Sequence, residues 1–177
     1  DCGAKPTNNR SEVQPFFAAP EMLPLDNIDA VVITHAHVDH IGMLPVLFKY
    51  GYKGPVYCTQ PTRDLMTLLQ MDYIKVAQAE GNDPPYSKSD IQECIKHVVD
   101  INWGEKTDIA PDIKMTMENA GHILGSSSVY MQIGEGRNEH KLLFSGDIKY
   151  EKSWLFDAAT VRFNKVDTLV VESTYGG

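Results

Sequence analysis

The sequence has few cysteines and lacks any long apolar run. Its three cysteines, Cys2, Cys58 and Cys94, are an odd number without Cys-x-x-Cys spacing, which argues against a disulfide framework or a zinc ribbon and favours reduced structural thiols. It contains neither a run of about 18 apolar residues nor a signal-peptide layout. We therefore expect a cytoplasmic protein that neither spans nor enters a membrane.

Basic residues are also scarce relative to acidic ones. The chain has 16 Lys and Arg against 24 Asp and Glu, a formal net charge of -8 at pH 7. Because nucleic-acid binders usually present a basic face, this charge argues against non-specific polyanion binding by the chain alone.

What the sequence does have is a dense group of metal-binding residue types, His35, His37, Asp39 and His40. They directly follow residues 30–33, Ala-Val-Val-Ile, which predict a buried strand, and they precede apolar positions that predict a helix from Ile41 to Phe48. At the end of an extended strand, side chains two apart point the same way, and the start of the helix can face the same spot. The pattern therefore predicts a metal site.

This His-x-His-x-Asp-His pattern resembles the signature of the metallo-β-lactamase superfamily. The resemblance implies an αββα sandwich that binds one or two metals, usually zinc, at its mouth. It leaves the substrate open.

Periodicity in the rest of the chain predicts an α/β fold. A stripe of Leu65, Leu68, Leu69, Tyr73 and Val76 predicts a helix over 61–80 that packs into the core, and Ser89-Asp90 can cap a second helix that ends near His97. Further strands are predicted at residues 56–59, 98–101, 114–117, 127–133, 141–144 and 166–172. The proline-rich stretch from Lys5 to Asp26 predicts a long loop. Helices interspersed with grouped strands indicate a two-sheet sandwich with outer helices.

Two more residues extend the predicted metal site. His122 lies between Gly121 and Gly125 after a strand, where the backbone can approach a metal closely. Asp147 follows the strand that ends at Phe144. Considered singly, each is more often a loop or cap residue. Together with the histidine run they indicate metal ligands.

These residue types suit zinc, which binds imidazole and carboxylate ligands at about 2.0–2.2 Å. The ligands divide between two ions: His35, His37 and His122 for one zinc, Asp39 and His40 for the other, and Asp147 bridging both. Two zinc ions about 3.5–4 Å apart would hold a bridging water and lower its pKa toward 7. Asp39 would also orient the hydroxide.

Two expectations concern groups around the ions. Asp1, at a strand end, is a candidate partner for a ligand histidine. The second zinc is short of one protein ligand, so we expect residues beyond Gly177 to complete the site.

A closer resemblance is to the β-CASP nucleases, whose motifs occur here in the typical order. The motifs are Asp1-Cys2-Gly3, Thr34 to Gly42, Ala120 to Ser126, Gly146-Asp147, and Glu172-Ser173-Thr174-Tyr175-Gly176. Residues 48–58, 61–65 and 107–114 narrow the resemblance to the archaeal ribonucleases related to the cleavage and polyadenylation specificity factor (CPSF). It covers nearly the whole chain, except the loop from Ala4 to Glu21.

This resemblance implies that residues 1–177 are a partial metallo-β-lactamase domain that ends where a β-CASP domain would begin. The N-terminal strands, the β-CASP domain and the C-terminal part of the fold would lie outside the chain. It implies a zinc-dependent endoribonuclease, with or without a 5′-to-3′ exonuclease mode, that acts on single-stranded RNA in 3′-end processing or transcription termination. Any homodimer would form through parts outside this chain.

The resemblance also gives Glu172 a catalytic part. A histidine further along such proteins is thought to protonate the leaving oxygen, and Glu172 would support that histidine. Because that histidine is absent here, we expect the isolated chain to be inactive.

Two other interpretations share the same ligands. One is a small-molecule hydrolase, a thioesterase or lactamase of the same fold; the Glu172-to-Gly176 ending and the long helical insert over residues 61–97 favour the nuclease. The other is a non-catalytic scaffold in a processing complex. Scaffolds lose ligands, whereas every ligand position that this chain could contain is filled.

Overall fold

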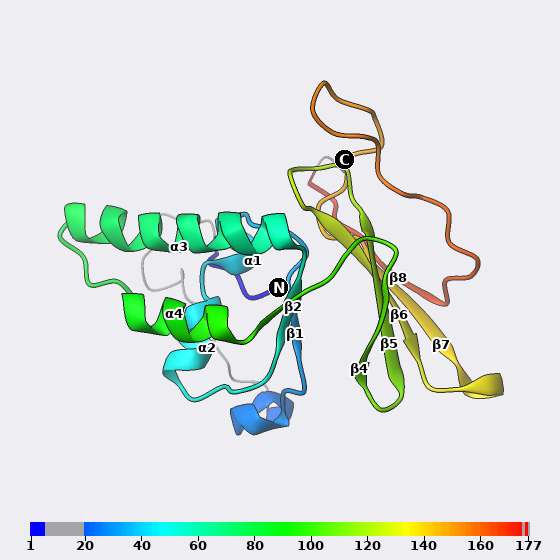
Figure 1. The fold of residues 1–177 in the computed structure, drawn as a ribbon, viewed down its shortest axis with the longest axis horizontal. Coiled ribbons are helices and arrows are strands. Elements are labelled where there is room, and N and C mark those ends of the chain that lie inside the picture. Colours follow the sequence, from blue (N-terminus) through cyan, green and yellow to red (C-terminus); the bar gives the residue numbers. More distant parts are fainter. Residues whose placement is uncertain (6–19, 175, 177) are drawn as a thin grey trace. The chain divides into compact units, whose positions relative to one another are not determined.

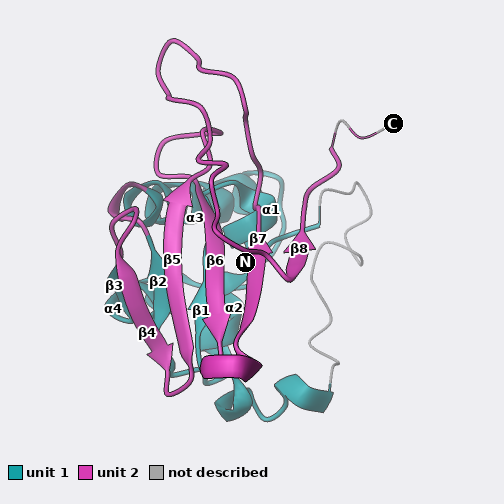
Figure 2. Ribbon diagram, turned by 90° about the vertical axis from the view of Figure 1, so that its right-hand side faces the viewer, with its two compact units in different colours: residues 1–58, 62–100 teal, residues 59–61, 101–177 magenta. Residues whose placement is uncertain are grey.

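The computed structural model describes residues 1–5, 20–174 and 176, so most of the loop predicted from Lys5 to Asp26 lies outside the described residues. The described part of that stretch contains two short 3-10 helices, Pro20–Met22 and Leu25–Asn27. The chain divides into two compact units (Figure 2). Unit 1 comprises residues 1–58 and 62–100, and unit 2 comprises residues 59–61 and 101–177.

Unit 1 contains a parallel sheet whose strands are joined through helices. The strands are β1 (Val31–Val32), β2 (Val56–Cys58) and β3 (Val98–Asp100), in the order β1-β2-β3. The helices are α1 (Val38–Ile41), α2 (Leu44–Lys49), α3 (Gln60–Ala79) and α4 (Lys88–Lys96) (Figure 1). Because parallel neighbours need a long crossover, α1 and α2 lie between β1 and β2, and α3 and α4 between β2 and β3.

The helix predicted from Ile41 to Phe48 is wrong as a single element, because the chain forms α1 and α2 with a break at Gly42 and Met43. Pro45 explains the break, since it has no N–H to bond the carbonyl of Ile41 four residues earlier. The Nε2 amide of Gln70 on α3 donates to that carbonyl instead, at 3.0 Å, and Gln70 is fully buried. A buried side chain on α3 thus holds the end of α1.

The helix predicted over 61–80 is confirmed as α3, but its buried face differs from the prediction. The buried residues are four apart along the helix: Thr62, Met66, Gln70 and Ile74. Leu68 and Val76, which were expected in the core, are 65% and 49% exposed. Two of the four buried residues are polar. A helix face identified from apolar residues alone is therefore rotated away from the face that is buried.

The start of α4 also differs from the prediction. Its N-cap is Ser87, whose hydroxyl accepts the Asp90 N–H at 3.4 Å while the Asp90 carboxylate accepts the Ser87 N–H at 2.7 Å. This capping box places Asp90 at the third helical position rather than at the cap. Because Ser87 and Ser89 are both capping residue types, composition alone did not separate them.

Unit 2 is built on one five-stranded sheet. Its strands are β4 (Lys106–Ala110), β5 (Ile113–Asn119), β6 (Ser127–Ile133), β7 (His140–Phe144) and β8 (Thr168–Val170). The first four pair antiparallel in sequence order, a 3-10 helix at Gly136–Asn138 connects β6 to β7, and β8 pairs parallel with β7. Residues 148–167 run between β7 and β8 without a helix or strand, as the long orange loop in Figure 1 shows.

Two strands of unit 2 differ from the prediction. The strand β4 was not expected, because Lys106 and Asp108 interrupt any apolar pattern and no residue of β4 is fully buried. The strand expected over 166–172 is reduced to Thr168–Val170. The α/β class is confirmed, and the helices and sheets are consistent with part of a metallo-β-lactamase fold. Among the described residues, no helix combines the length and hydrophobicity needed to span a bilayer.

Candidate metal centre

His35 and His37 lie where the chain leaves the sheet of unit 1. The N–H of Ile33 donates to the carbonyl of Tyr57 at 2.9 Å, which continues the pairing of β1 with β2 by one residue. Just beyond it, His35 Nε2 lies 3.0 Å from His37 Nδ1, and His35 is fully buried. Two nitrogens bound to one tetrahedral zinc at about 2.0–2.1 Å lie about 3.3 Å apart. The observed separation is therefore close to what one shared ion requires.

The next two predicted ligands form a second pair in unit 1. Asp39 and His40 lie in α1, and His40 Nε2 is 3.7 Å from Asp39 Oδ2. The ring centroid of His40 lies 4.0 Å from that of His35. Unit 1 thus presents two neighbouring pairs of potential ligand atoms, one of imidazole nitrogens and one of an imidazole with a carboxylate.

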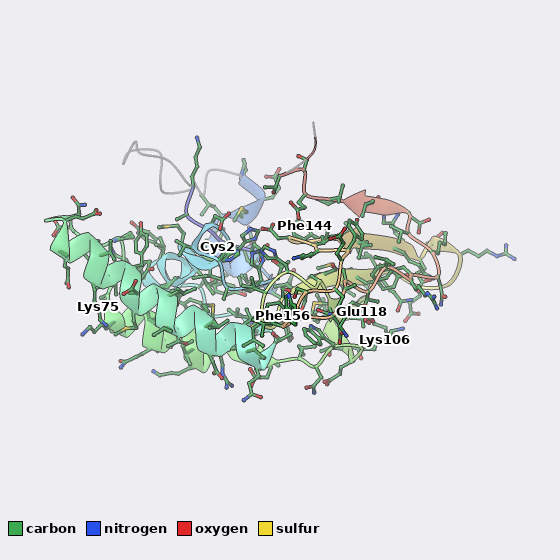
Figure 3. All side chains as sticks on the ribbon, turned by 90° about the horizontal axis from the view of Figure 1, so that it is seen from above. Cys2, Lys75, Lys106, Glu118, Phe144 and Phe156 are labelled. Atoms are coloured by element: carbon green, nitrogen blue, oxygen red, sulfur yellow. The ribbon has the colours of Figure 1, made fainter. Side chains whose placement is uncertain are left out.

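The N-terminal segment, residues 1–4, runs beside α1 and holds it; Cys2 of this segment is labelled in Figure 3. The Cys2 N–H donates to the His40 carbonyl at 2.7 Å, and the Ala4 N–H donates to the Val38 carbonyl at 3.0 Å. The backbones approach so closely that a Cβ atom on Gly3 would lie 1.5 Å from the Asp39 carbonyl oxygen. Only glycine allows this contact.

Asp1 is connected to the histidine run through three hydrogen bonds. Its Oδ1 accepts the Thr34 N–H at 2.7 Å, and its Oδ2 accepts the Thr34 hydroxyl at 2.8 Å. The same Oδ2 lies 2.8 Å from His40 Nδ1. A carboxylate can only accept, so a neutral His40 facing it carries its proton on Nδ1 and offers Nε2 to a metal.

In unit 2 the predicted ligands His122 and Asp147 form a third pair. His122 Nε2 lies 3.5 Å from Asp147 Oδ2, and both side chains are partly buried. The Ser126 hydroxyl oxygen shapes the loop that carries His122, because it accepts the N–H groups of both His122 and Ile123 at 3.1 Å. Hydrogen bonds within the loop therefore fix its shape, just after β5 ends.

Gly121 allows two backbone segments of unit 2 to approach each other closely. Its φ is +68°, and a Cβ atom there would lie 2.7 Å from both the Lys149 carbonyl oxygen and the Ala159 nitrogen. The close approach is thus to the backbone of the loop after Asp147. The Lys149 N–H also donates to the Ala120 carbonyl at 2.9 Å. The segments that carry His122 and Asp147 are joined through this contact.

Glu172 lies just after β8, and its carboxylate accepts backbone N–H groups. Its Oε1 accepts the Ile148 N–H at 2.8 Å, and its Oε2 accepts the Thr174 N–H at 3.4 Å. Hydrogen bonding from Thr174 and from the Ile148 backbone lowers the pKa of Glu172 below its ordinary value. Glu172 is therefore anionic at neutral pH and fixes the residue that follows Asp147.

Within unit 1, the structure brings together Asp1, His35, His37, Asp39 and His40, and within unit 2 His122 with Asp147. Of these, His35, His37, His122 and Asp147 are candidate metal ligands by residue type and burial. Sequence reasoning assigned no individual role to Thr34, Ser126 or Gln70. The position of Thr34 directly before His35 could have suggested it, whereas Gln70 is 29 residues from its carbonyl partner and no local pattern indicates it.

The sequence matches one family profile over nearly its whole length. A profile described as the beta-lactamase superfamily domain matches residues 1–176. The chain belongs to the metallo-β-lactamase superfamily.

Its relatives include archaeal proteins named transcription termination factor FttA. The chain is 52% identical to the one from Methanococcus maripaludis over 177 residues, and 52% identical to the one from Methanosarcina mazei over 176 residues. It is 51% identical to the protein from Thermococcus kodakarensis over 171 residues. These alignments cover 100%, 99% and 94% of this chain but only 27%, 27% and 26% of the relatives. The chain therefore spans about a quarter of the length of these proteins.

Proposed function

We propose that this chain supplies most of a two-zinc centre that hydrolyses phosphodiester bonds of single-stranded RNA in transcription termination or RNA 3′-end formation. The observation that carries the proposal is the pairing of His35 Nε2 with His37 Nδ1 at 3.0 Å in a chain of this superfamily. The high identity to proteins named transcription termination factor favours a nucleic-acid role over a small-molecule hydrolase.

The proposed ligands keep the assignment made from the sequence: His35, His37 and His122 for one zinc, Asp39 and His40 for the other, and Asp147 for both. The separations within the pairs, 3.0, 3.7 and 3.5 Å, support it. Imidazole nitrogen with carboxylate oxygen is a donor set that zinc prefers and that magnesium does not. The residues present therefore fit the metal.

Bound zinc would supply Lewis acidity that activates water near neutral pH and stabilises charge on the phosphoryl group. Asp39, whose side chain is 48% exposed, would accept a hydrogen bond from the attacking water and orient it. Asp1 would keep the His40 proton on Nδ1. Glu172 would support a histidine further along the protein that protonates the leaving 3′ oxygen, because each carboxylate oxygen can accept more than one hydrogen bond.

The charge of the chain limits its part in substrate binding. With a net charge of -8, this chain would hold RNA mainly at the metal centre, and basic surfaces elsewhere in the protein would bind the rest of the substrate. If the substrate is nascent RNA, the protein acts in the cytoplasm.

The test uses the full-length protein with three substrates: a labelled single-stranded RNA, a lactam and a thioester. Each is assayed as purified, after removal of metal with a chelator, and after zinc is restored. The proposal predicts RNA cleavage that the chelator abolishes and zinc restores, with no turnover of the other two. Turnover of only the lactam or the thioester would mean a small-molecule hydrolase. A zinc-loaded protein that turns over none of them would be a scaffold.

A further inference from the structure

Thr34 lies between the Asp1 carboxylate and the first histidine of the metal motif. Its hydroxyl oxygen is 2.8 Å from Asp1 Oδ2 and 3.0 Å from His35 Nδ1. Thr34 is 2% exposed and His35 is fully buried, so bulk water does not reach these groups. The backbone N–H of Thr34 also donates to Asp1 Oδ1, which fixes the carboxylate relative to the hydroxyl.

The single proton of this hydroxyl decides the direction of both hydrogen bonds. The carboxylate of Asp1 can only accept, so the hydroxyl donates to it. The hydroxyl oxygen is then an acceptor toward His35, and His35 must donate from Nδ1. A neutral imidazole carries one proton, which leaves the lone pair on His35 Nε2, the atom that faces His37.

We propose that Thr34 is a positioning residue. Because its hydroxyl donates to the Asp1 carboxylate, it can only accept from His35, and this places the His35 proton on Nδ1. One carboxylate then sets the tautomers of two metal ligands, directly for His40 through Nδ1 and through the Thr34 hydroxyl for His35. In both rings Nδ1 carries the proton and Nε2 is available to a metal. This inference rests on the proposed zinc centre and not on the ribonuclease reaction.

Removal of the hydroxyl has a specific consequence. In a Thr34→Val variant, which keeps the shape of the side chain, His35 Nδ1 loses its acceptor. The buried ring then favours the other tautomer, whose Nε2–H can donate to His37 Nδ1, 3.0 Å away. In the wild type the same two nitrogens share a hydrogen bond with the proton on His37 Nδ1, so zinc displaces a bond of this kind in either protein. In the variant zinc binding must also move the His35 proton from Nε2 to Nδ1, where the threonine hydroxyl no longer accepts it, which costs free energy.

The experiment measures the zinc affinity of the full-length protein by competition with a chromophoric chelator, together with the visible absorption spectrum of the cobalt(II)-substituted protein. Thr34→Val is compared with Thr34→Ser, which keeps the hydroxyl. The control is Thr107→Val on β4, where the hydroxyl oxygen is buried and has no hydrogen-bond partner in the described part of the chain. Thermal unfolding of the metal-free proteins checks that each variant folds.

We expect Thr34→Val to weaken zinc binding by about 10- to 100-fold, the usual effect of losing a group that orients a metal-bound histidine. Its cobalt spectrum should change, whereas Thr34→Ser and Thr107→Val should match the wild type in both. Wild-type affinity in Thr34→Val would overturn the proposal. Equal losses in Thr34→Ser and Thr34→Val would also overturn it, because they would assign the effect to packing. If the wild type itself bound no zinc, the proposed function would fail first.

A double-mutant cycle separates coupling between Asp1 and Thr34 from the independent effects of the two substitutions. In Asp1→Asn, the amide can donate to the Thr34 hydroxyl, which would turn the hydroxyl toward His35 as a donor and favour the wrong tautomer. Thr34→Val removes this route. Asp1→Asn should therefore weaken zinc binding by a smaller factor in the Thr34→Val background than in the wild type. Equal factors in both backgrounds would mean that Thr34 relays nothing from Asp1.

Discussion

His35 Nε2 and His37 Nδ1 face each other at 3.0 Å across rings that are nearly perpendicular, with an interplanar angle of 82°. The two rings thus use different nitrogens toward the same point. Two neutral imidazoles in this arrangement share one hydrogen bond, and a metal must replace it. The proposed zinc would bind at this pair, so the protonation of each ring matters for binding.

The first prediction concerns Asp147, which is proposed to bind both ions. Asp147→Ala should lower zinc occupancy at both positions, whereas His40→Ala should lower it at one. Zinc per full-length chain after dialysis, measured by elemental mass spectrometry, gives the answer, with Asp112→Ala in the exposed β4–β5 turn as the control. A bridging role is refuted if Asp147→Ala keeps two zinc ions while His40→Ala loses one.

The second prediction concerns Glu172. Glu172→Gln should slow RNA cleavage by about 10²-fold if proton transfer limits the rate, because an amide cannot stabilise a protonated histidine as a carboxylate does. Zinc content and RNA binding should stay near the wild-type values, since the Gln carbonyl can still accept the Ile148 N–H. Glu118→Gln on β5 is the matched control. Wild-type turnover in Glu172→Gln would remove Glu172 from the mechanism.

The third prediction concerns Gly3. Gly3→Ala should destabilise the protein by about 3 kcal/mol, the upper range for overpacking, because the new Cβ atom would overlap the Asp39 carbonyl. The N-terminal segment must move to relieve this overlap, and the movement should separate Asp1 from His40 and weaken zinc binding.

The comparison for Gly3 is Gly81→Ala, at a glycine with positive φ and open space around its Cβ position. It should cost about 1 kcal/mol, because alanine is disfavoured at positive φ, and leave zinc affinity unchanged. Chemical denaturation and chelator competition measure the two effects. Similar losses of stability in both variants would contradict the close packing of the N-terminal segment.

The fourth prediction concerns pH and the buried cysteines. Burial raises the pKa of the Cys58 thiol to about 12, and burial likewise raises the pKa of Cys94. At pH 8 the Cys58 thiolate fraction is then about 0.01%, against about 24% for an unfolded cysteine with a pKa of about 8.5. Iodoacetamide should modify these cysteines far more slowly in the native protein than in urea, as followed by mass spectrometry.

The raised pKa values of these thiols also determine whether stability rises or falls at alkaline pH. Between about pH 8.5 and the raised folded-state pKa values, the unfolded chain loses thiol protons that the folded chain keeps, so the free energy of unfolding falls as pH rises. The contribution of these thiols is fully present below about pH 8.5. Fast native alkylation at pH 8, or stability that increases over this range, would contradict the burial of these thiols.

Much of the fold and most of the candidate ligands could be predicted because their signals are local. His35, the first residue of the histidine run, lies three residues after the end of β1, and the ends of α3 lie within one residue of the predicted 61–80. Where local signals compete, prediction fails. Pro45 divides the helix expected from Ile41 to Phe48. Charged residues interrupt the apolar pattern that would have predicted β4.

The rest depends on partners that are distant in the sequence. Gln70 on α3 was invisible to an apolar pattern because its burial depends on the carbonyl that Pro45 leaves unbonded. Thr34 was passed over because its role appears only when Asp1 lies beside it, 33 residues away. Side-chain networks of this kind require the fold to be known first.

The ends of the cleavage products record whether water attacks the phosphorus of RNA at this centre and the 3′ oxygen leaves. Single-stranded RNA is cut by the zinc-loaded full-length protein in water enriched in oxygen-18, and the ends are identified by mass spectrometry. We expect a 5′-phosphate that carries one oxygen-18 atom and a free 3′-hydroxyl. A 2′,3′-cyclic phosphate with a 5′-hydroxyl and no oxygen-18 would contradict it, because attack by the ribose 2′-hydroxyl needs no activated water.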